Sequence, residues 1–329
     1  MVSSDLNTLQ SKVTVRFHRR FVDLNKTDAK RIVVMTGGTS GIGANAVKRI
    51  ATQPNTRLII GARGVQSGLE GVEVIWLDLA SLVSVRTFAD EIKQQLGKAH
   101  IDILVLNAGV QTMDLKHRTV DGFELTFGVN HLAHYLLARL LVPCMVDDGR
   151  LVITTSDTHD PAKFSGAPKS LDPETLAHPP EGAKFSAYPA SKLCDLLTAR
   201  SLAAIAKVQA PYITVIAYNP GLTLGTGLSR NAPRAVRGLM RILMPPIAGL
   251  LSLFKPQFYP GNPKRSGEVL AQLALGEINL PTGHVYASLV RGKITFPDPS
   301  ALAQSDEARD LLWRESAVMV GIQTEPTCK

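Results

Sequence analysis

A glycine-rich turn near the amino terminus constrains the fold of this chain more than any other feature. The apolar run of residues 32–36 precedes the turn, and a helix-like stretch over residues 44–51 follows it. The turn itself contains Gly37, Gly41 and Gly43. Glycine lets a backbone approach a pyrophosphate closely, and the following helix offers free N–H groups at its amino terminus. The order strand, turn, helix therefore predicts a phosphate-binding unit, although an ordinary tight turn has the same pattern.

Composition narrows the class of protein. Of 329 residues, 45% are hydrophobic and 19% are charged, so the chain can bury a large core. The net charge of +8 suits nucleic acid, an anionic surface or a phosphate-rich cofactor, but zinc-finger spacings and arginine-rich tracts are absent, so we expect no nucleic-acid partner. Three cysteines without a Cys-x-x-Cys pair favour a reducing compartment. Without a secretory signal or a long apolar segment, we expect a cytoplasmic protein.

Strand and helix patterns alternate from residue 30 onward. The expected strands are residues 32–36, 57–60, 72–77, 103–106, 151–153, 213–216 and 284–286. The expected helices are residues 44–51, 123–145, 188–207, 264–278 and 305–320, with another that Ser81 caps at its amino terminus. Repeated strand–helix units of this kind predict an α/β fold with a doubly wound parallel sheet.

Three segments fall outside this alternation. Residues 1–29 form an expected amino-terminal extension to a single domain, residues 30–329. Residues 157–187 and 222–263 are long, proline-containing segments that follow strands, at the sheet edge where doubly wound folds bind ligands. We expect residues 222–263 to form a lid over an apolar small-molecule substrate, or an oligomer contact. The alternative is peripheral membrane contact through the apolar and basic residues 234–255.

The stretch Tyr-Pro-Ala-Ser-Lys places Tyr188 and Lys192 four residues apart on an expected helix. Residues with this spacing share one helix face, so the ammonium should lie near the phenol. A nearby positive charge favours the phenolate and would lower the pKa of Tyr188 from its usual value near 10. Tyr188 could then act as a general acid or base near neutral pH. The alternative is a surface tyrosine and lysine that share this spacing by chance.

These motifs, with others in the same order, resemble the short-chain dehydrogenase/reductase family over roughly residues 30–290. The matching motifs are Thr-Gly-Gly-Thr-Ser-Gly-Ile-Gly at 36–43, Asp-Leu at 78–79, Asn-Ala-Gly at 107–109, Asn130, Ser156, the Tyr188–Lys192 stretch and Pro-Gly at 220–221. The resemblance implies a Rossmann-type doubly wound parallel sheet of about seven strands. Together with the residues after the second strand, it implies cofactor contacts from Gly37, Thr39, Ser40, Gly41, Ile42, Gly43, Arg63, Asp78, Leu79, Asn107, Ala108, Gly109, Tyr188, Lys192, Pro220 and Gly221.

The resemblance also assigns catalytic roles. Tyr188 would exchange a proton with a carbonyl or alcohol oxygen, and Lys192 would lower its pKa and bind the nicotinamide ribose. Ser156 would hold the substrate oxygen, and Asn130 would hold a water that connects Lys192 to solvent. The family often has Ser-Ser where this chain has Thr155 and Ser156, so Thr155 is the alternative hydroxyl.

The residue that follows the second strand bears on the choice of cofactor. NAD-binding folds usually place an acidic residue there, whereas this chain has Arg63, which can pair with a 2′-phosphate. We therefore expect NADP(H), with a solvated arginine as the alternative, and we expect Asp78 to contact the adenine. His131 and His134 lack an evident third ligand, so we expect no metal site. His159 could line the substrate pocket or be an ordinary loop histidine.

The expected activity is that of an NADP(H)-dependent oxidoreductase that interconverts a carbonyl and an alcohol on an apolar substrate. Residues 78–86 and 129–137 are similar to those of retinol dehydrogenases, WW-domain oxidoreductases and protochlorophyllide reductases. One alternative is therefore reduction of an activated C=C bond. Another is a non-catalytic dinucleotide-binding protein, which would have a broken set of catalytic residues. The resemblance suggests a monomer or a homodimer.

Overall fold

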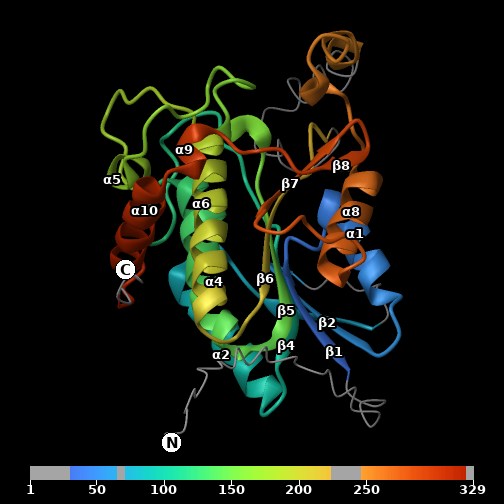
Figure 1. Cartoon of the computed structure of the whole chain (residues 1–329). Helices are drawn as coiled ribbons and strands as arrows, with labels where there is room; N and C mark the ends of the chain where they lie inside the picture. Colours follow the sequence, from blue (N-terminus) through green and yellow to red (C-terminus); the bar gives the residue numbers. More distant parts are fainter. Residues whose placement is uncertain (1–29, 65–70, 224–245, 324–329) are drawn as a thin grey trace, which may run out of the picture.

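The computed structural model describes residues 30–64, 71–223 and 246–323 (Figure 1). The expected extension, residues 1–29, and the middle of the expected lid, residues 224–245, lie outside the described residues. None of the described helices is both long enough and apolar enough to span a membrane.

A single eight-stranded sheet, in the order β3-β2-β1-β4-β5-β6-β7-β8, forms the centre of the molecule. The strands are β1 (Arg31–Thr36), β2 (Thr56–Ala62), β3 (Val72–Trp76), β4 (Ile101–Leu106), β5 (Met145–Thr154), β6 (Thr214–Asn219), β7 (Tyr286–Val290) and β8 (Lys293–Thr295). The first seven pair in parallel and β8 pairs antiparallel to β7. The predicted doubly wound sheet of about seven strands is therefore confirmed, with one short strand added.

Helices cover both faces of this sheet (Figure 1). The α-helices whose bounds lie wholly within the described residues are α1 (Gly41–Ala51), α2 (Leu82–Leu96), α3 (Leu125–Phe127), α4 (Ala133–Leu141), α5 (Pro173–Ala177), α6 (Ala187–Val208), α8 (Pro263–Leu275), α9 (Ala301–Gln304) and α10 (Asp306–Met319). Helices α1 and α8 pack on each other and on one face, while α2, α4 and α6 cover the other face. Strand order reverses between β1 and β4, which is where ligands bind in such folds.

The hydrophobic core lies on both sides of the sheet, as the uninterrupted apolar runs predict. Alternate residues of β4 face the two layers: Leu104 and Leu106 join one cluster with α2, α4 and α6, and Ile103 and Val105 join the other with α1 and α8. A strand buried on both faces needs apolar residues at every position, which is why its sequence shows no polar alternation.

The long helix predicted over residues 123–145 is present over residues 125–144, but it is not one regular α-helix. A helix starts at Leu125, widens into a π-helical turn over Gly128–Leu132, continues as α4 and ends at Leu141. A 3₁₀ turn that contains Pro143 follows, and Met145 already belongs to β5. Proline cannot donate the backbone hydrogen bond that a continuing helix needs. π-helical turns of this kind are frequent at functional sites, and this one contains Asn130.

Other elements differ from prediction mainly at their ends. The side chain of Ser81 accepts a hydrogen bond from the backbone N–H of Ser84 at 3.3 Å, so the predicted amino-terminal cap is confirmed. The helix predicted to reach residue 278 stops at Leu275 because Gly276, with φ of 79°, terminates it in a left-handed conformation. The last predicted strand, residues 284–286, is displaced: β7 begins only at Tyr286.

Candidate functional site

The glycine turn between β1 and α1 is closely packed and leaves room for glycine alone at two positions. Gly37 has φ of 68°, and a methyl group on it would lie 2.6 Å from the backbone of Ala108. A methyl group on Gly43 would lie 1.8 Å from the carbonyl oxygen of Gly37. Helix α1 begins at Gly41, and the side chain of Ser40 makes no capping hydrogen bond. The N–H groups of this helix end therefore suit a phosphate group.

Thr36 joins this turn to the loop after β4. Its hydroxyl oxygen accepts hydrogen bonds from the backbone N–H groups of Asn107 and Ala108 at 3.1 and 3.2 Å. The Asn107 side-chain amide in turn donates to the carbonyl oxygen of Gly37 at 3.0 Å. These contacts fix the two loops at the switch point relative to each other, so the glycine turn is held in place by a hydrogen-bonded network.

A cavity of about 590 Å³ opens beside the glycine turn. Fifteen of the sixteen residues predicted to contact the cofactor line it: Gly37, Thr39, Ser40, Gly41, Ile42, Gly43, Arg63, Asp78, Leu79, Asn107, Ala108, Gly109, Tyr188, Lys192 and Pro220. The remaining one, Gly221, lines the neighbouring cavity. We call the first cavity the dinucleotide cavity, because an extended groove with a helix amino terminus and an exposed arginine fits a phosphate-rich dinucleotide.

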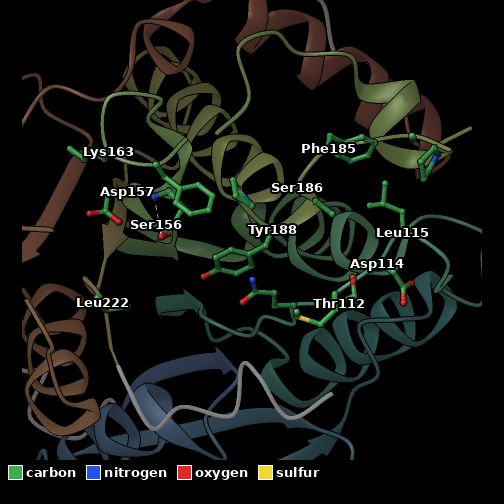
Figure 2. Close-up of a pocket in the computed structure, with 18 of the residues that line it drawn as sticks. Thr112, Asp114, Leu115, Ser156, Asp157, Lys163, Phe185, Ser186, Tyr188 and Leu222 are labelled. Atoms are coloured by element: carbon green, nitrogen blue, oxygen red, sulfur yellow. Dashed lines mark hydrogen bonds between the residues drawn. The ribbon is translucent and has the colours of Figure 1, made fainter. Parts of the chain in front are cut away.

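A second cavity, of about 1250 Å³, adjoins the first, and we call it the substrate cavity (Figure 2). Figure 2 shows Ser156 and Tyr188 projecting into it. The apolar side chains of Phe164, Phe185 and Leu222 contribute to its wall. Three residues border both cavities: Ile42, Tyr188 and Pro220. Tyr188 therefore stands at the junction of the dinucleotide and substrate cavities.

Both long segments expected to bind ligand contribute to the substrate cavity. Residues 157–187 contribute 157–158, 163–164, 179–183 and 185–187. The described ends of residues 222–263 contribute Leu222, Thr223, Gln257 and Phe258. Closure of this segment as a lid stays a prediction.

The pKa of Tyr188 is raised, which contradicts the lowered value expected from its spacing to Lys192. Burial is the largest cause, because the phenolate loses its hydration. Lys192 and a hydrogen bond with Ser156 act to lower the pKa of Tyr188, but the carboxylates of Asp195 and Asp157 act to raise it. The spacing of Tyr188 and Lys192 indicates one positive charge near the phenol. It does not reveal the burial of Tyr188 or the two negative charges nearby.

The ammonium group of Lys192 is buried and makes two hydrogen bonds to the protein. Its Nζ donates to the carbonyl oxygen of Thr154 at 2.9 Å and to Oδ2 of Asp195 at 2.8 Å. It lies 5.7 Å from the centroid of the Tyr188 ring. Burial is the largest single influence on the pKa of Lys192 and acts to lower it, but the charge of Asp195, Tyr188 and the hydrogen bond to Asp195 together raise the pKa. Burial also raises the pKa of Asp195 to about 6. Sequence reasoning missed Asp195, although its i+3 spacing from Lys192 was a visible signal.

The hydroxyl groups of Thr155 and Ser156 have different surroundings. The Thr155 hydroxyl donates to the backbone carbonyl oxygen of Lys192 at 2.6 Å, whereas Ser156 lines the substrate cavity and hydrogen-bonds Tyr188. This arrangement favours Ser156 as the substrate-facing hydroxyl.

Asn130 supports the site from behind and lines neither cavity as found here. Its side chain accepts from the backbone N–H of Val110 at 2.8 Å, and donates to the Val110 carbonyl oxygen and to the Ser191 hydroxyl, both at 3.0 Å. Its backbone oxygen accepts from Nδ1 of His134 at 2.9 Å. Asn130 thus ties the loop after β4 to α6; its predicted water-binding role stays a prediction.

His159 has a structural role and does not face the cavity. Its ring is fully buried, Nδ1 donates to the Ser156 carbonyl oxygen at 2.6 Å, and Nε2 accepts from the backbone N–H of Ser300 at 3.3 Å. Among the described residues, no group of three or more histidine, cysteine, aspartate or glutamate side chains is placed to hold a metal ion.

Comparison with known proteins places these features in context. A family model described as short chain dehydrogenase matches residues 31–166. The chain is 32% identical over 333 residues to a chloroplastic protochlorophyllide reductase from Cucumis sativus, which covers 91% of this chain and 80% of that protein. It is 30% identical over 324 residues to a polyprenol dehydrogenase from Danio rerio, with 92% and 90% covered. A WW domain-containing oxidoreductase from Drosophila melanogaster is 35% identical over 217 residues, and this chain covers 51% of its length.

Solved structures share the fold. An uncharacterized protein from Mycobacterium paratuberculosis superposes with a TM-score of 0.64 at 25% identity, over 90% of this chain and 96% of that one. A short chain dehydrogenase from Burkholderia cenocepacia J2315, in complex with NADP, superposes with a TM-score of 0.52 at 23% identity, over 76% and 92%. From its sheet order, its glycine turn and these matches, the chain belongs to the short-chain dehydrogenase/reductase family of oxidoreductases.

Proposed function

We propose that this protein is an NADP(H)-dependent oxidoreductase that interconverts a carbonyl and an alcohol on an apolar substrate. One observation carries the proposal: Tyr188 borders both the dinucleotide cavity and the substrate cavity. A proton donor at this junction can reach a substrate oxygen while the reacting carbon faces the dinucleotide.

The residues at the junction of the two cavities have different roles in the reaction. NADP(H), when bound, supplies or accepts the hydride. In reduction, the Ser156 hydroxyl donates a hydrogen bond to the carbonyl oxygen, and Tyr188 transfers its phenolic proton to that oxygen as the alcohol forms. The positive charge of Lys192 then stabilises the phenolate that remains. In oxidation, the phenolate of Tyr188 takes the proton of the alcohol, and the other roles are unchanged.

The preference for NADP(H) over NAD(H) rests on Arg63. This residue follows β2, is exposed, and lines the dinucleotide cavity next to Ala62 and Gly64, so its guanidinium is free to meet a 2′-phosphate. The Burkholderia dehydrogenase holds NADP in the same fold, which is consistent with this choice.

The substrate class follows from the size and lining of the substrate cavity. Its volume of about 1250 Å³ exceeds that of common small-molecule pockets, roughly 300–1,000 Å³. Aromatic side chains from separate segments, Phe164, Phe185 and Phe258, contribute to the lining. A large, predominantly apolar substrate would bury most surface here.

Reduction of an activated C=C bond is a second candidate, because the protochlorophyllide reductase of Cucumis sativus matches over 91% of the chain. Tyr188 could protonate a carbon centre as well as an oxygen, so the same cavity supports both reactions. Turnover that requires light and an extended C=C substrate would favour this second candidate.

The test is oxidation of NADPH with a panel of apolar aldehydes, ketones and enones, in darkness and in light. We expect turnover of a carbonyl in darkness, a much slower rate with NADH, and a loss of at least about a hundredfold in Tyr188→Phe. Tyr212→Phe, at an exposed position, is the matched control and should keep full activity. Equal turnover in Tyr188→Phe and in the wild type would refute the proposal.

A further inference from the structure

Asp195 is a buried carboxylate beside the reaction centre to which the proposed mechanism gives no role. It lies one helical turn after Lys192 on α6, and 2% of its surface is exposed. Its Oδ2 accepts a hydrogen bond from Lys192 Nζ at 2.8 Å. A buried ion pair is weak evidence for stability, because both charges lose their hydration. Because Lys192 Nζ lies 5.7 Å from the centroid of the Tyr188 ring, the ion pair is placed to act on the reaction centre.

The pair determines how the ammonium group is presented. An ammonium carries three N–H donors. Two are directed to the Thr154 carbonyl oxygen and to Asp195. Lys192 also lines the dinucleotide cavity, so one of its three donors is left for a group that binds there. Asp195 thus orients Lys192 and places a negative charge directly behind it.

We propose that Asp195 is a positioning residue that acts through Lys192: it orients the ammonium and offsets its charge, and so weakens the stabilisation that Lys192 gives to the phenolate of Tyr188. The inference rests on the proposed function. Protonated Tyr188 is the form that donates to a carbonyl oxygen, so Asp195 favours reduction. Oxidation needs the phenolate, which Asp195 disfavours.

Several charged and titratable groups surround Tyr188 and Lys192, and the sign of each charge decides whether it favours or opposes the phenolate of Tyr188. From α6, Lys192 favours the phenolate of Tyr188 and Asp195 opposes it. From the turn after β5, Asp157 also opposes it. Burial raises the pKa of Asp157, and Lys163 acts to lower it.

A histidine approaches from the opposite element. His134 on α4 faces Lys192, and burial followed by the charge of Lys192 lowers the pKa of His134 to about 3. His134 is therefore neutral at neutral pH and adds no charge. Asp195, with a pKa of about 6, is largely ionised above that pH, which is the range in which the proposed effect operates.

The experiment is a spectroscopic titration of Tyr188 in the full chain without substrate. Tyrosinate absorbance is recorded against pH, and the signal of Tyr188 is the difference between proteins that carry Tyr188 and their Tyr188→Phe counterparts. Asp195→Asn keeps the shape of the side chain and removes its charge. We expect this variant to lower the midpoint of Tyr188 by about one pH unit or more.

Two further variants test whether the shift depends on the charge at position 195. Thr198→Val changes a buried hydroxyl on the same helix that has no hydrogen-bond partner, so it should leave the Tyr188 midpoint unchanged. Asp195→Glu retains the charge and should keep the midpoint near that of the wild type. If Asp195→Asn does not fold, as judged by circular dichroism, the smaller neutral Asp195→Ser replaces it with the same expected shift. A Tyr188 signal that is identical with and without the charge at 195, including no signal in either protein, overturns the proposal.

Because the titration needs no substrate, its outcome is independent of whether carbonyl turnover is found. With a carbonyl substrate, the alkaline limit of kcat/KM for reduction should move to lower pH in Asp195→Asn by the same amount, while oxidation of the alcohol at neutral pH becomes faster. A loss of rate with an unchanged pH profile would indicate a structural role and would contradict the inference.

Discussion

The hydroxyl of Thr36, at the end of β1, lies 2.9 Å from Nε2 of His134 on α4, and both side chains are buried. Because Nδ1 of His134 donates to the Asn130 carbonyl oxygen, Nε2 is the acceptor and Thr36 the donor. The same threonine oxygen accepts the two N–H groups of the loop after β4. The Thr36 side chain therefore connects the end of β1 to the switch-point loop and, through His134, to the π-helical turn.

Thr36→Val should destabilise the protein and weaken dinucleotide binding together. The substitution leaves the N–H groups of Asn107 and Ala108 and the acceptor of His134 without their partner, at a cost of about 1–3 kcal/mol in the free energy of unfolding. Denaturant titration and NADPH titration by fluorescence measure the two effects. Thr198→Val, which removes a hydroxyl without a partner, is the matched control and should cost little. Equal stabilities of the two variants would contradict this account.

Gly43→Ala should abolish high-affinity NADPH binding. Its methyl group would lie 1.8 Å from the carbonyl oxygen of Gly37, so the turn must open and the helix end must move away from the phosphate position. We expect the dissociation constant for NADPH to rise by at least about tenfold, the loss of a charge-assisted contact. Gly249→Ala, where the added methyl group meets nothing within 4 Å, is the control. Calorimetry that finds unchanged affinity in Gly43→Ala would exclude the turn as the phosphate site.

Arg63→Ala should change the choice between the two nicotinamide cofactors. Loss of a guanidinium that pairs with the 2′-phosphate should weaken NADPH by about 10- to 100-fold and leave NADH nearly unchanged. Arg57→Ala, on the strand that precedes Arg63, removes an arginine whose partners are Glu73 and Gln95, so it should not alter the ratio. Parallel weakening of both cofactors in Arg63→Ala would assign Arg63 a non-selective role.

The outline of the fold was predictable because strong local patterns decide it. A run of apolar residues was enough to predict β4. Apolar residues at helical spacing, with Ser81 as the cap, were enough to predict α2. Strand β8 was missed because three residues, Lys293–Thr295, carry no pattern and owe their conformation to pairing with β7. The helix error at residues 123–145 arose because apolar spacing does not reveal a π-helical turn held by the tertiary contacts of Asn130.

The site was predictable in its parts but not in its electrostatics. Fifteen of the sixteen residues predicted to contact the cofactor line one cavity, because strand ends in a parallel sheet meet at one edge. The pKa of Tyr188 was predicted in the wrong direction, since burial and the distance to Asp157 depend on packing between distant segments. Asp195 shares a helix turn with Lys192, yet its burial follows from how α6 packs on the sheet.

Ser156 and Thr155 can be separated by kinetics. Ser156→Ala removes a hydroxyl that faces the substrate cavity and should reduce kcat by about 10²–10³-fold, as expected for loss of a donor to a developing oxyanion. Thr155→Val removes a hydroxyl that donates to the Lys192 carbonyl oxygen, so it should reduce stability more than kcat. Steady-state rates and denaturant titration of both variants distinguish the two, and a reversed pattern would transfer the catalytic role to Thr155.

Acid should destabilise the protein through its buried histidines. Burial lowers the pKa of both His131 and His134 to about 3, so the folded chain binds fewer protons than the unfolded chain between that value and the usual histidine pKa near 6.5. Because the unfolded state binds more protons there, the free energy of unfolding falls as the pH drops through this window, by up to about 1.4 kcal/mol per pH unit for each histidine. Asp195, whose pKa is raised to about 6, opposes this trend because its protonation favours the folded state.

A substitution of His131 separates its contribution to the pH dependence from those of His134 and Asp195. His131→Leu should remove one titrating group, so the free energy of unfolding should depend less steeply on pH between about 6 and 4.5, by up to about 1.4 kcal/mol per pH unit. The substitution also breaks the 2.8 Å hydrogen bond between His131 Nε2 and the Ser316 hydroxyl, which lowers stability by a similar amount at every pH and leaves the slope unaffected. His284→Leu at an exposed position is the control. Urea titrations at a series of pH values measure each slope, and a His131→Leu slope equal to that of the wild type would show that His131 is protonated in the folded chain.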